Sequence, residues 1–319
     1  MKKVALLTSG GDAPGMNACI RAVVRAGENE GYQMIGVLNG YQGLIEGSFQ
    51  QLSHGAVENI IGLGGTILKT SRSEEFMTKT GFQKALKNIK KEGFDALIVL
   101  GGDGSMRGAK QLMESGVNVI CIPCTIDNDM AYTTYTIGFD TAINTVTEML
   151  GRVRDTSVSH ERICVVEVMG RNSGDIALAG GVAVGAEVVL VPEVEFKLKS
   201  VCEKIKKSIS VGEKCVMVVV AEGVTSAENL AQTLKEKLKK DVKSLDIGYI
   251  QRGGNPTTND RILATRMGTL AIEEVTRGKF GVAIGGNYVK VASFKLDNIF
   301  GIKDNFDEKL LKKNDLLSI

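Results

Sequence analysis

The sequence predicts an α/β protein, with a largely parallel sheet in its first half and a second α/β domain after it. Its 319 residues allow roughly two domains of about 150 residues each. Short apolar runs alternate with segments of helical period, as in βαβ units. Glycine is abundant (38 residues, against only 4 prolines), which indicates tight turns in a folded protein rather than a disordered linker. No linker of distinctive composition marks a boundary, so more than one crossing between the domains is compatible with the sequence.

Each expected element follows from a local pattern. Helices are expected over Met16–Glu30 and Thr80–Glu92, where apolar residues recur on one face. Asp140 is expected to cap a further helix, which carries Ile143, Val146, Leu150 and Val153. The apolar runs predict strands at Val4–Thr8, Met34–Leu38, Ala96–Leu100, Val117–Ile122, Ile163–Val168, Val188–Val191, Cys215–Ala221 and Val282–Ile284.

Composition excludes several classes of partner. Lys plus Arg (39) nearly balance Asp plus Glu (37), which gives no reason to expect a nucleic-acid or an anionic membrane partner. There is no apolar run of the ~18 residues that a membrane span needs. The start, Met1–Leu7, resembles a short signal sequence, but its apolar stretch is brief and leads into a glycine turn. It is interpreted as the first strand, and a cytoplasmic location is expected.

The six cysteines lie mostly inside apolar runs, which favours small core residues in a reducing compartment. Cys121 and Cys124 form a C-x-x-C, and a zinc or redox role is the alternative. A zinc site needs two further ligands, yet there is no second C-x-x-C and the only histidines are His54 and His160. The pattern therefore favours the core interpretation.

Paired glycines follow three expected strands, in LLTSGGD, IVLGGDGS and VAIGGN. Ligands of open parallel sheets bind beyond the carboxyl ends of strands, where glycine lets phosphate oxygens approach the backbone. In GGDGS, Asp103 is placed to hold Mg²⁺, and the helix that follows favours negative charge at its start. The alternative is a plain strand-to-helix turn capped by Asp103. The spacings match neither a P-loop nor a Rossmann fingerprint.

The segment PCTIDND, at 123–129, follows a strand directly. In an extended stretch Asp127 and Asp129 would point to the same side, which suits one base and one metal-binding or orienting group. The alternative is an Asp/Asn turn. Arg171 and Arg252 sit in glycine-flanked turns after apolar runs, and arginine holds phosphate bidentately. Together these features suggest a Mg²⁺-dependent phosphotransferase.

The motifs TSGGDAPGMN, GGDGS, TIDND, IGFDTA, RDTSVSHERI, VVEVMGR, VPEVEF and IQRGGNPTTNDRILATRMG occur in order between residues 8 and 268. As a set they resemble the bacterial ATP-dependent 6-phosphofructokinase family. The resemblance implies two similar lobes, each a mostly parallel sheet flanked by helices, in a homotetramer. Residues 1–138 plus 251–301 would bind ATP, and residues 139–250 plus 302–319 would bind the sugar phosphate.

The resemblance also implies roles for individual residues. Asp127 would take the proton of the sugar 1-hydroxyl, Thr125 and Arg171 would stabilise the transferring phosphoryl group, and Asp103 would bind magnesium. The group around ATP would be Gly11, Tyr41, Arg72, Ser73, Gly102, Asp103, Gly104 and Ser105. Fructose 6-phosphate would be held by Thr125, Asp127, Met169, Gly170, Arg171, Glu222, Lys243, Tyr249 and Arg252, with Arg162 arriving from a neighbouring subunit.

Four positions bear on donor and substrate. The family's pyrophosphate-using relatives typically carry Asp and Lys where this chain has Gly104 and Cys124; Gly104 fits ATP, and Cys124 replaces a usual Gly. The family usually has Arg and His where this chain has Lys243 and Tyr249, so weak fructose 6-phosphate binding or a shifted sugar-phosphate preference is expected.

The family's effector site takes ADP or phosphoenolpyruvate between subunits. Lost positive charge at His54, Val211 and Glu213 predicts muted or absent allostery. The residues assigned to the effector are Arg21, Arg25, His54, Arg154, Gly185, Glu187 and Lys214. Three alternatives to a 6-phosphofructokinase are a related kinase with another sugar phosphate or donor, a weakly catalytic ligand-binding paralogue, and a lipid or NAD kinase. The last would not explain TIDND together with IQRGGNP.

Overall fold

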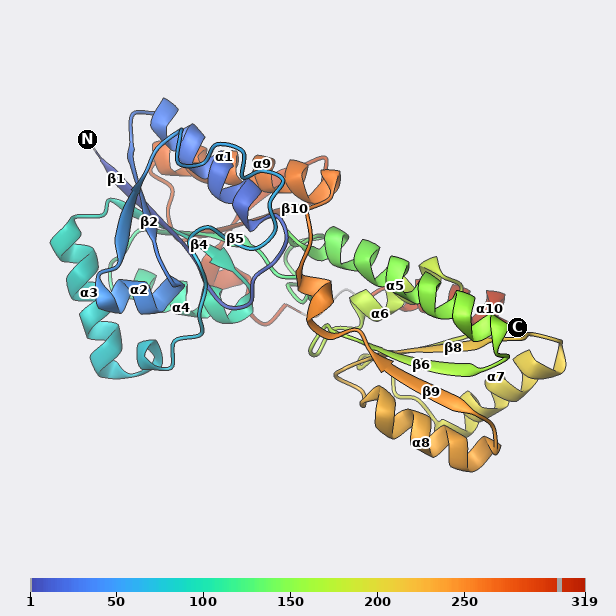
Figure 1. The fold of residues 1–319 in the computed structure, drawn as a ribbon. Coiled ribbons are helices and arrows are strands. Elements are labelled where there is room, and N and C mark those ends of the chain that lie inside the picture. Colours follow the sequence, from blue (N-terminus) through green and yellow to red (C-terminus); the bar gives the residue numbers. More distant parts are fainter. Residues whose placement is uncertain (1, 303–305, 319) are drawn as a thin grey trace. The chain divides into compact units, whose positions relative to one another are not determined.

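A computed structural model describes residues 2–302 and 306–318, and the chain divides into two compact units. The α/β class with mostly parallel sheets is confirmed (Figure 1). Unit 1 comprises Met1–Ile126, Met130–Thr141 and Arg252–Asp304. Unit 2 comprises Asp127–Asp129, Ala142–Gln251 and Asn305–Ile319.

The unit bounds at 141, 251 and 304 stand beside the expected lobe bounds at 138, 250 and 301. One segment differs in kind: Asp127–Asp129 was expected in the first lobe and groups with unit 2. The chain thus leaves unit 1 for three residues within the TIDND loop. That each unit is a ligand-binding lobe stays a prediction.

The described part of unit 1 holds one seven-stranded sheet, in the order β11-β10-β5-β4-β1-β2-β3. All neighbours are parallel except the two edge pairs, β2 with β3 and β10 with β11. The central strands β4 and β5 are buried along their whole length, as expected for strands covered on both faces. The strands are β1 (Lys3–Thr8), β2 (Gln33–Val37), β3 (Phe49–Leu52), β4 (Ala96–Gly101), β5 (Val119–Pro123), β10 (Val282–Gly286) and β11 (Val291–Lys295).

Helices cover both faces of this sheet (Figure 1). On one face α1 and α9 pack together, and Gly268 permits the close approach, since a Cβ there would lie 2.9 Å from that of Ala22. On the other face α2, α3 and α4 bury their apolar sides against alternate residues of β1 and β4. The helices are α1 (Met16–Asn29), α2 (Gly40–Glu46), α3 (Lys79–Glu92), α4 (Asp103–Glu114) and α9 (Thr258–Thr276), with 3₁₀ turns η1 (Glu75–Met77) and η3 (Leu296–Asn298).

Unit 2 is built on a parallel sheet in the order β7-β8-β6-β9. Helices α7 and α8 pack on one face, and α5, α6 and α10 lie on the other (Figure 1). Its strands are β6 (Ile163–Val168), β7 (Val188–Leu190), β8 (Val216–Ala221) and β9 (Val242–Asp246). Its helices are α5 (Phe139–Ser159), which begins in unit 1, α6 (Asp175–Ala183), α7 (Leu198–Ser210), α8 (Ala227–Leu238), the 3₁₀ turn η2 (Gly248–Arg252) and α10 (Glu308–Leu317).

One local prediction, the Asp140 cap, and one local alternative, the Asp103 cap, were wrong. Asp140 is not a cap: α5 starts at Phe139, and the Asp140 carboxylate accepts hydrogen bonds from Thr257 and Asn259 instead. Asp103 is not a cap either, because α4 begins at Asp103 with Gly102 in the N-cap position. The GGDGS loop is therefore largely the first turn of a helix.

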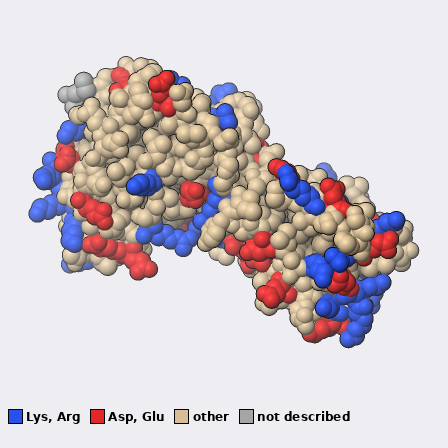
Figure 2. All heavy atoms as spheres, viewed as in Figure 1, with Lys and Arg blue, Asp and Glu red and all other residues tan. Residues whose placement is uncertain are grey.

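The cysteine and membrane predictions concern the interior. All six cysteines are unpaired and buried, and the described residues contain no cluster of three or more metal-ligating side chains. The burial of Cys121 and Cys124 agrees with their interpretation as core residues. None of the described helices is both long and apolar enough to cross a membrane. On the face shown in Figure 2, positive and negative side chains are interspersed.

Substituting Gly101 should destabilise unit 1, whereas substituting its near neighbour Gly104 should not. A Cβ on Gly101 would lie 2.6 Å from the Ser9 carbonyl oxygen and 2.4 Å from Ser105 Oγ. Gly101→Ala should cost about 1–3 kcal/mol of unfolding free energy through overpacking. Gly104→Ala meets nothing within 4 Å and lies in a helix, so it should gain up to about 1 kcal/mol. Urea unfolding of both variants checks this; equal effects would contradict it.

Candidate functional site

The first group of site residues lies at the carboxyl ends of β1, β4 and β5. The chain passes from β1 to β2 on one side and returns to β4 on the other, which creates a switch point where open α/β sheets bind ligands. Hydrogen bonds join the three strand ends: Ser9 N–H donates to Leu100 O (3.0 Å), and Cys124 N–H donates to Gly101 O (3.0 Å). The glycine turns after β1 and β4 are thereby held next to each other.

Small residues leave the backbone at this edge accessible. A Cβ on Gly102 would lie 3.5 Å from that of Thr125, and a Cβ on Gly11 would lie 3.5 Å from the Arg252 guanidinium carbon. Helix α4 begins beside them with no side-chain cap, so its first N–H groups and its positive dipole end face this edge. Thr125, Gly102, Gly11 and Arg252 thus form one region of unit 1 suited to bind phosphate oxygens.

Asp103 stands in the first turn of α4 with its side chain 44% exposed. One carboxylate oxygen accepts a hydrogen bond from Arg107 Nε at 2.7 Å. A half-exposed carboxylate next to a phosphate-binding loop fits Mg²⁺, which usually binds through one or two carboxylates together with phosphate oxygens and water. Asp103 therefore suits the magnesium role that the resemblance implies.

Other residues assigned to ATP differ in exposure. Tyr41 is buried: its hydroxyl donates to Ser105 O at 2.5 Å, and its ring stacks on Phe76 at 4.2 Å. Burial raises the pKa of Tyr41 well above its usual value, so the hydroxyl remains a donor. Ser73 donates to Gln42, while Arg72 is exposed. Tyr41 hence supports the first turn of α4 from within the core.

The second group belongs to unit 2 and centres on Asp127. This carboxylate is only 3% exposed, and Arg171 Nε lies 3.3 Å from its Oδ2. Asn128 donates to Asp175 at 2.8 Å and has a φ of +53°, so the segment bends there. The extended geometry expected for Asp127–Asp129 is therefore wrong. The pair combines a buried carboxylate with the exposed guanidinium of Arg171, and proton transfer beside a phosphoryl group needs such a carboxylate and cation.

A turn after β6 fixes Arg171. Both Gly170 and Arg171 have positive φ, and their N–H groups donate to Glu222 Oε1 at 3.1 and 2.8 Å. Met169 N–H donates to the side chain of Gln251 at 3.1 Å. Glu222 follows β8, so the carboxyl ends of β6 and β8 together orient the arginine. The sequence indicates no role for Gln251, Asn128 or Asp175, because their hydrogen bonds join residues 47 and 82 positions apart.

Arg162 and Lys243 lie at the opposite, amino end of the unit 2 sheet. Arg162 precedes β6 and Lys243 is the second residue of β9, and both pair with Asp241, at 3.1 and 3.2 Å. The hydrogen bond from Lys243 is the main cause of a lowered Asp241 pKa. Tyr249, in η2 beyond the other end of β9, is 78% exposed. The structure therefore does not bring Arg162 and Lys243 to Asp127 within one chain.

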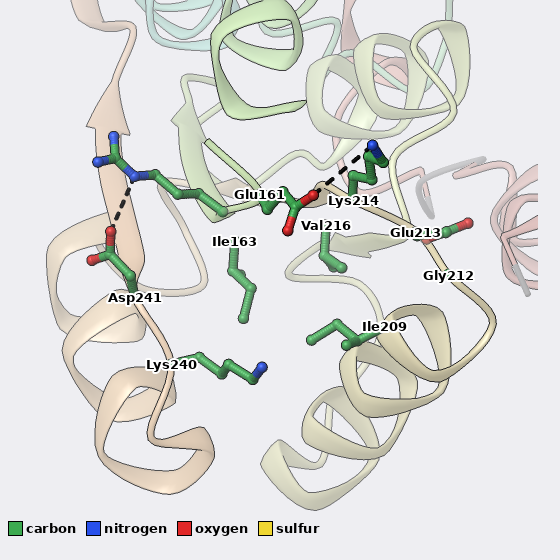
Figure 3. Close-up of a pocket in the computed structure, with 10 residues that line it drawn as sticks. Glu161, Ile163, Ile209, Gly212, Glu213, Lys214, Val216, Lys240 and Asp241 are labelled. Atoms are coloured by element: carbon green, nitrogen blue, oxygen red, sulfur yellow. Dashed lines mark ion pairs between the residues drawn. The ribbon is translucent and has the colours of Figure 1, made fainter. Parts of the chain in front are cut away.

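A cavity of about 320 Å³ lies at this amino end. Ion pairs on its wall join Arg162 to Asp241 and Glu161 to Lys214 (Figure 3). Figure 3 shows the Lys240 side chain across from Ile163 and Ile209, so the wall mixes both signs of charge with apolar side chains. This cavity has no single electrostatic preference.

Three of the effector candidates contact one another. Arg154 contacts Glu187 Oε1 at 3.1 Å and donates to Gly185 O at 2.9 Å. Glu187 is buried and also accepts from Met217 N–H. Burial, and then the charge of Glu187, raises the pKa of Glu213. Lys214 pairs with Glu161 instead, while Arg21, Arg25 and His54 belong to unit 1.

The switch-point glycines, the open start of α4 and the Asp127–Arg171 pair are features of α/β proteins that handle phosphate groups. The family model for phosphofructokinase matches residues 3–275, and the chain belongs to that family.

Full-length relatives agree with the family assignment. The chain is 48% identical to the ATP-dependent 6-phosphofructokinase of Clostridium tetani over 310 residues, which is 97% of each chain. It is 48% identical to that of Clostridium botulinum strain Hall over 318 residues, which is 100% of each chain. The phosphofructokinase structure from Saccharomyces cerevisiae superposes with a TM-score of 0.86 at 31% identity, over 100% of this chain and 48% of the yeast chain. This chain thus spans about half of the yeast chain.

Proposed function

We propose that the protein transfers the γ-phosphoryl group of ATP to the 1-hydroxyl of fructose 6-phosphate, giving ADP and fructose 1,6-bisphosphate in glycolysis. The observation that carries the proposal is the pair of a buried Asp127 carboxylate with the exposed Arg171, in a chain that belongs to the phosphofructokinase family. We place the enzyme in the cytoplasm.

In the proposed reaction the sugar oxygen forms a bond to the γ-phosphorus while the bond from that phosphorus to the ADP oxygen breaks. Asp127 accepts the proton of the hydroxyl and later returns it to solvent. A loose transition state lets the proton leave late, so a carboxylate is a sufficient base. Arg171 donates to the equatorial oxygens, and its Nε, 3.3 Å from Asp127 Oδ2, orients the carboxylate. Thr125, two residues before Asp127 in the loop, adds a hydroxyl donor.

The triphosphate would lie along Gly11 and Gly102 to Ser105, with Arg72 and Arg252 pairing its charge. Mg²⁺, held by Asp103, would neutralise charge that develops on the phosphate oxygens. The sugar would be held by Met169, Gly170 and Glu222. Gly104 has open space where the pyrophosphate-using relatives carry a larger side chain, which favours ATP as donor.

Strand geometry supports an oligomer. Six residues of β6 separate Arg162 from the Met169–Arg171 turn, a span of about 20 Å at the usual rise. An arginine at one end of the strand cannot contact a substrate at the other end. Arg162, and Lys243 beside it, would bind the sugar phosphate only of a neighbouring subunit. We therefore propose a homotetramer.

Replacing Asp127 should abolish turnover while leaving the fold intact. Asp127→Ser removes the base, and general-base groups contribute about 10²–10⁴-fold to rates. We expect kcat for fructose 1,6-bisphosphate formation to fall by at least about 100-fold. The matched control is Glu236→Ser, which removes an exposed carboxylate of the same unit and should leave kcat unchanged. Substantial activity in Asp127→Ser would refute the assigned base.

Binding of fructose 6-phosphate should be weak and should be improved by two substitutions. The Lys243→Arg and Tyr249→His double variant supplies a bidentate donor and an imidazole, and two hydrogen bonds to a charged group are worth about 1.5–3 kcal/mol each. The KM for fructose 6-phosphate should fall at least about tenfold. Asp241→Asn removes the carboxylate that pairs with Arg162 and Lys243, and should lower the KM in the same direction.

A wild-type KM already in the range of other family members would overturn this expectation. If another phosphosugar saturates the enzyme at a lower concentration than fructose 6-phosphate does, the protein is a related kinase with a different sugar-phosphate substrate. Lys243 and Tyr249 are the specific observation that favours that second candidate.

ADP and phosphoenolpyruvate should have little effect on turnover. Arg154 is already paired with Glu187, and Glu213 adds a carboxylate next to that pair, so a phosphate group meets repulsion there. Rates measured against fructose 6-phosphate concentration should give nearly the same curve with and without millimolar ADP or phosphoenolpyruvate. Strongly sigmoidal kinetics that ADP relieves would contradict weakened effector binding.

A further inference from the structure

Asp260 is a buried carboxylate to which the proposed chemistry gives no role. It is the third residue of α9 and is fully buried. Its carboxylate accepts three hydrogen bonds: from Gly138 N–H at 2.9 Å, from Thr141 N–H at 2.8 Å and from the Thr141 hydroxyl at 2.5 Å. All three donors stand at the start of α5. Asp260 thus accepts hydrogen bonds from the first N–H groups of α5, as an N-cap side chain would, although it belongs to α9.

The segment before α5 leads directly to the phosphoryl-transfer loop. The Thr136 hydroxyl donates to Thr125 O at 2.7 Å, and Ile137 N–H donates to Pro123 O at 3.0 Å. Residue 137 also forms a parallel bridge with Cys124. Thr136, which contacts the Thr125 backbone, is therefore only two residues before Gly138, whose N–H donates to Asp260.

The same segment is held against the turn that follows β1. Gly138 has a φ of +109°, and a Cβ there would lie 2.7 Å from that of Ala13. A Cβ on Gly15 would lie 2.7 Å from the Ile137 side chain and 3.6 Å from the Asp260 Cβ. Residues 136–138 therefore pack between the β1–α1 turn and the Thr125 backbone. A displacement of residues 136–138 would displace the Thr125 backbone as well, because the packing leaves no free space.

We propose that Asp260 is a positioning residue for phosphoryl transfer: by holding the start of α5 it fixes Thr136, and through Thr136 the backbone of Thr125. The inference rests on the proposed function of the Thr125–Asp127 loop. A displacement of about 1 Å at a reacting group costs on the order of 100-fold in rate, so a role of this kind is measurable in kcat.

The charges around Asp260 add a pH dependence. The titratable groups that interact with it are Asp140 on α5, Cys124 after β5 and Tyr288 before β11, all neutral or negative. Burial raises the pKa of Asp260 to about 6, against lowering by its three hydrogen bonds. Protonation of Asp260 would place an O–H group where a carboxylate oxygen accepts a hydrogen bond from Gly138 or Thr141. The hold on α5 should hence weaken as the pH falls through about 6.

The sign for stability is opposite. Because the pKa of Asp260 is raised on folding, the folded chain binds this proton more tightly than the unfolded chain. The contribution of this group to stability is present at acid pH and is lost as the pH rises through about 6. If Asp260 positions the loop, kcat should fall as the pH drops below about 6, while the melting temperature should not fall because of this group. A purely stabilising residue would not give this combination.

The test compares Asp260→Asn with Glu273→Gln, an exposed carboxylate on the same helix, in the full-length protein. We expect Asp260→Asn to lower kcat by about 10–100-fold, to change the KM for ATP less than threefold, and to lose the wild-type decline of kcat near pH 6. Thr141→Val, which keeps shape and removes the hydroxyl, should lower kcat about tenfold. Thr147→Val, whose hydroxyl bonds only its own helix, should not.

Hydrogen exchange provides a readout that does not depend on turnover. Amides in 123–126 and 136–141 should exchange faster in Asp260→Asn and Thr141→Val than in wild type and the two controls. Unchanged exchange there, or an Asp260→Asn protein whose folded fraction has wild-type kcat, overturns the inference. If wild type itself shows no turnover but exchange increases as expected, the proposed function fails and the hold of Asp260 on the loop stands.

Discussion

The hydrogen bonds that join the carboxyl ends of β1, β4 and β5 determine where chemistry takes place in unit 1. Ser9 and Cys124 each donate from just beyond a strand to the end of the next one, so three turns stay in register with the sheet. This fixed sheet edge brings Gly101 close to the Ser9 carbonyl and Gly102 close to Thr125, and the first N–H groups of α4 beside them have no side-chain cap. Every phosphate-binding feature of unit 1 depends on this register.

Unit 2 uses the same design with different chemistry. The ends of β6 and β8 form a turn that is held by a carboxylate, Glu222, rather than by neighbouring glycine loops. The turn forces Arg171 into a left-handed conformation and aims it at Asp127. Strain of this kind, in a non-glycine residue at a strand end, is typical of functional positions. The carboxyl edge of the unit 1 sheet thus suits phosphate binding, and that of the unit 2 sheet suits charge stabilisation and proton transfer.

Most central strands were predictable because burial on both faces gives continuous apolar runs, as in Ile163–Val168, whose bounds were correct. Three edge strands, β3, β9 and β11, were missed because each exposes residues along its length and carries no continuous apolar run. The buried, apolar edge strand β7 was predicted. Site chemistry was visible in Asp127 and Arg171, since charge next to glycine is informative. The support from Gln251 and Asp260 was not, because hydrogen bonds across 82 and 119–122 positions leave no local pattern.

The burial of Cys124 has a consequence for inhibitor chemistry. This thiol is one residue from Thr125, which makes it a natural anchor for an electrophilic warhead aimed at the phosphoryl-transfer loop. Yet it is fully buried, and burial followed by the neighbouring Cys19 thiol raises its pKa well above the usual value, so the reactive thiolate is scarce. The Cys124 thiol should therefore react slowly with electrophiles and oxidants while the fold persists.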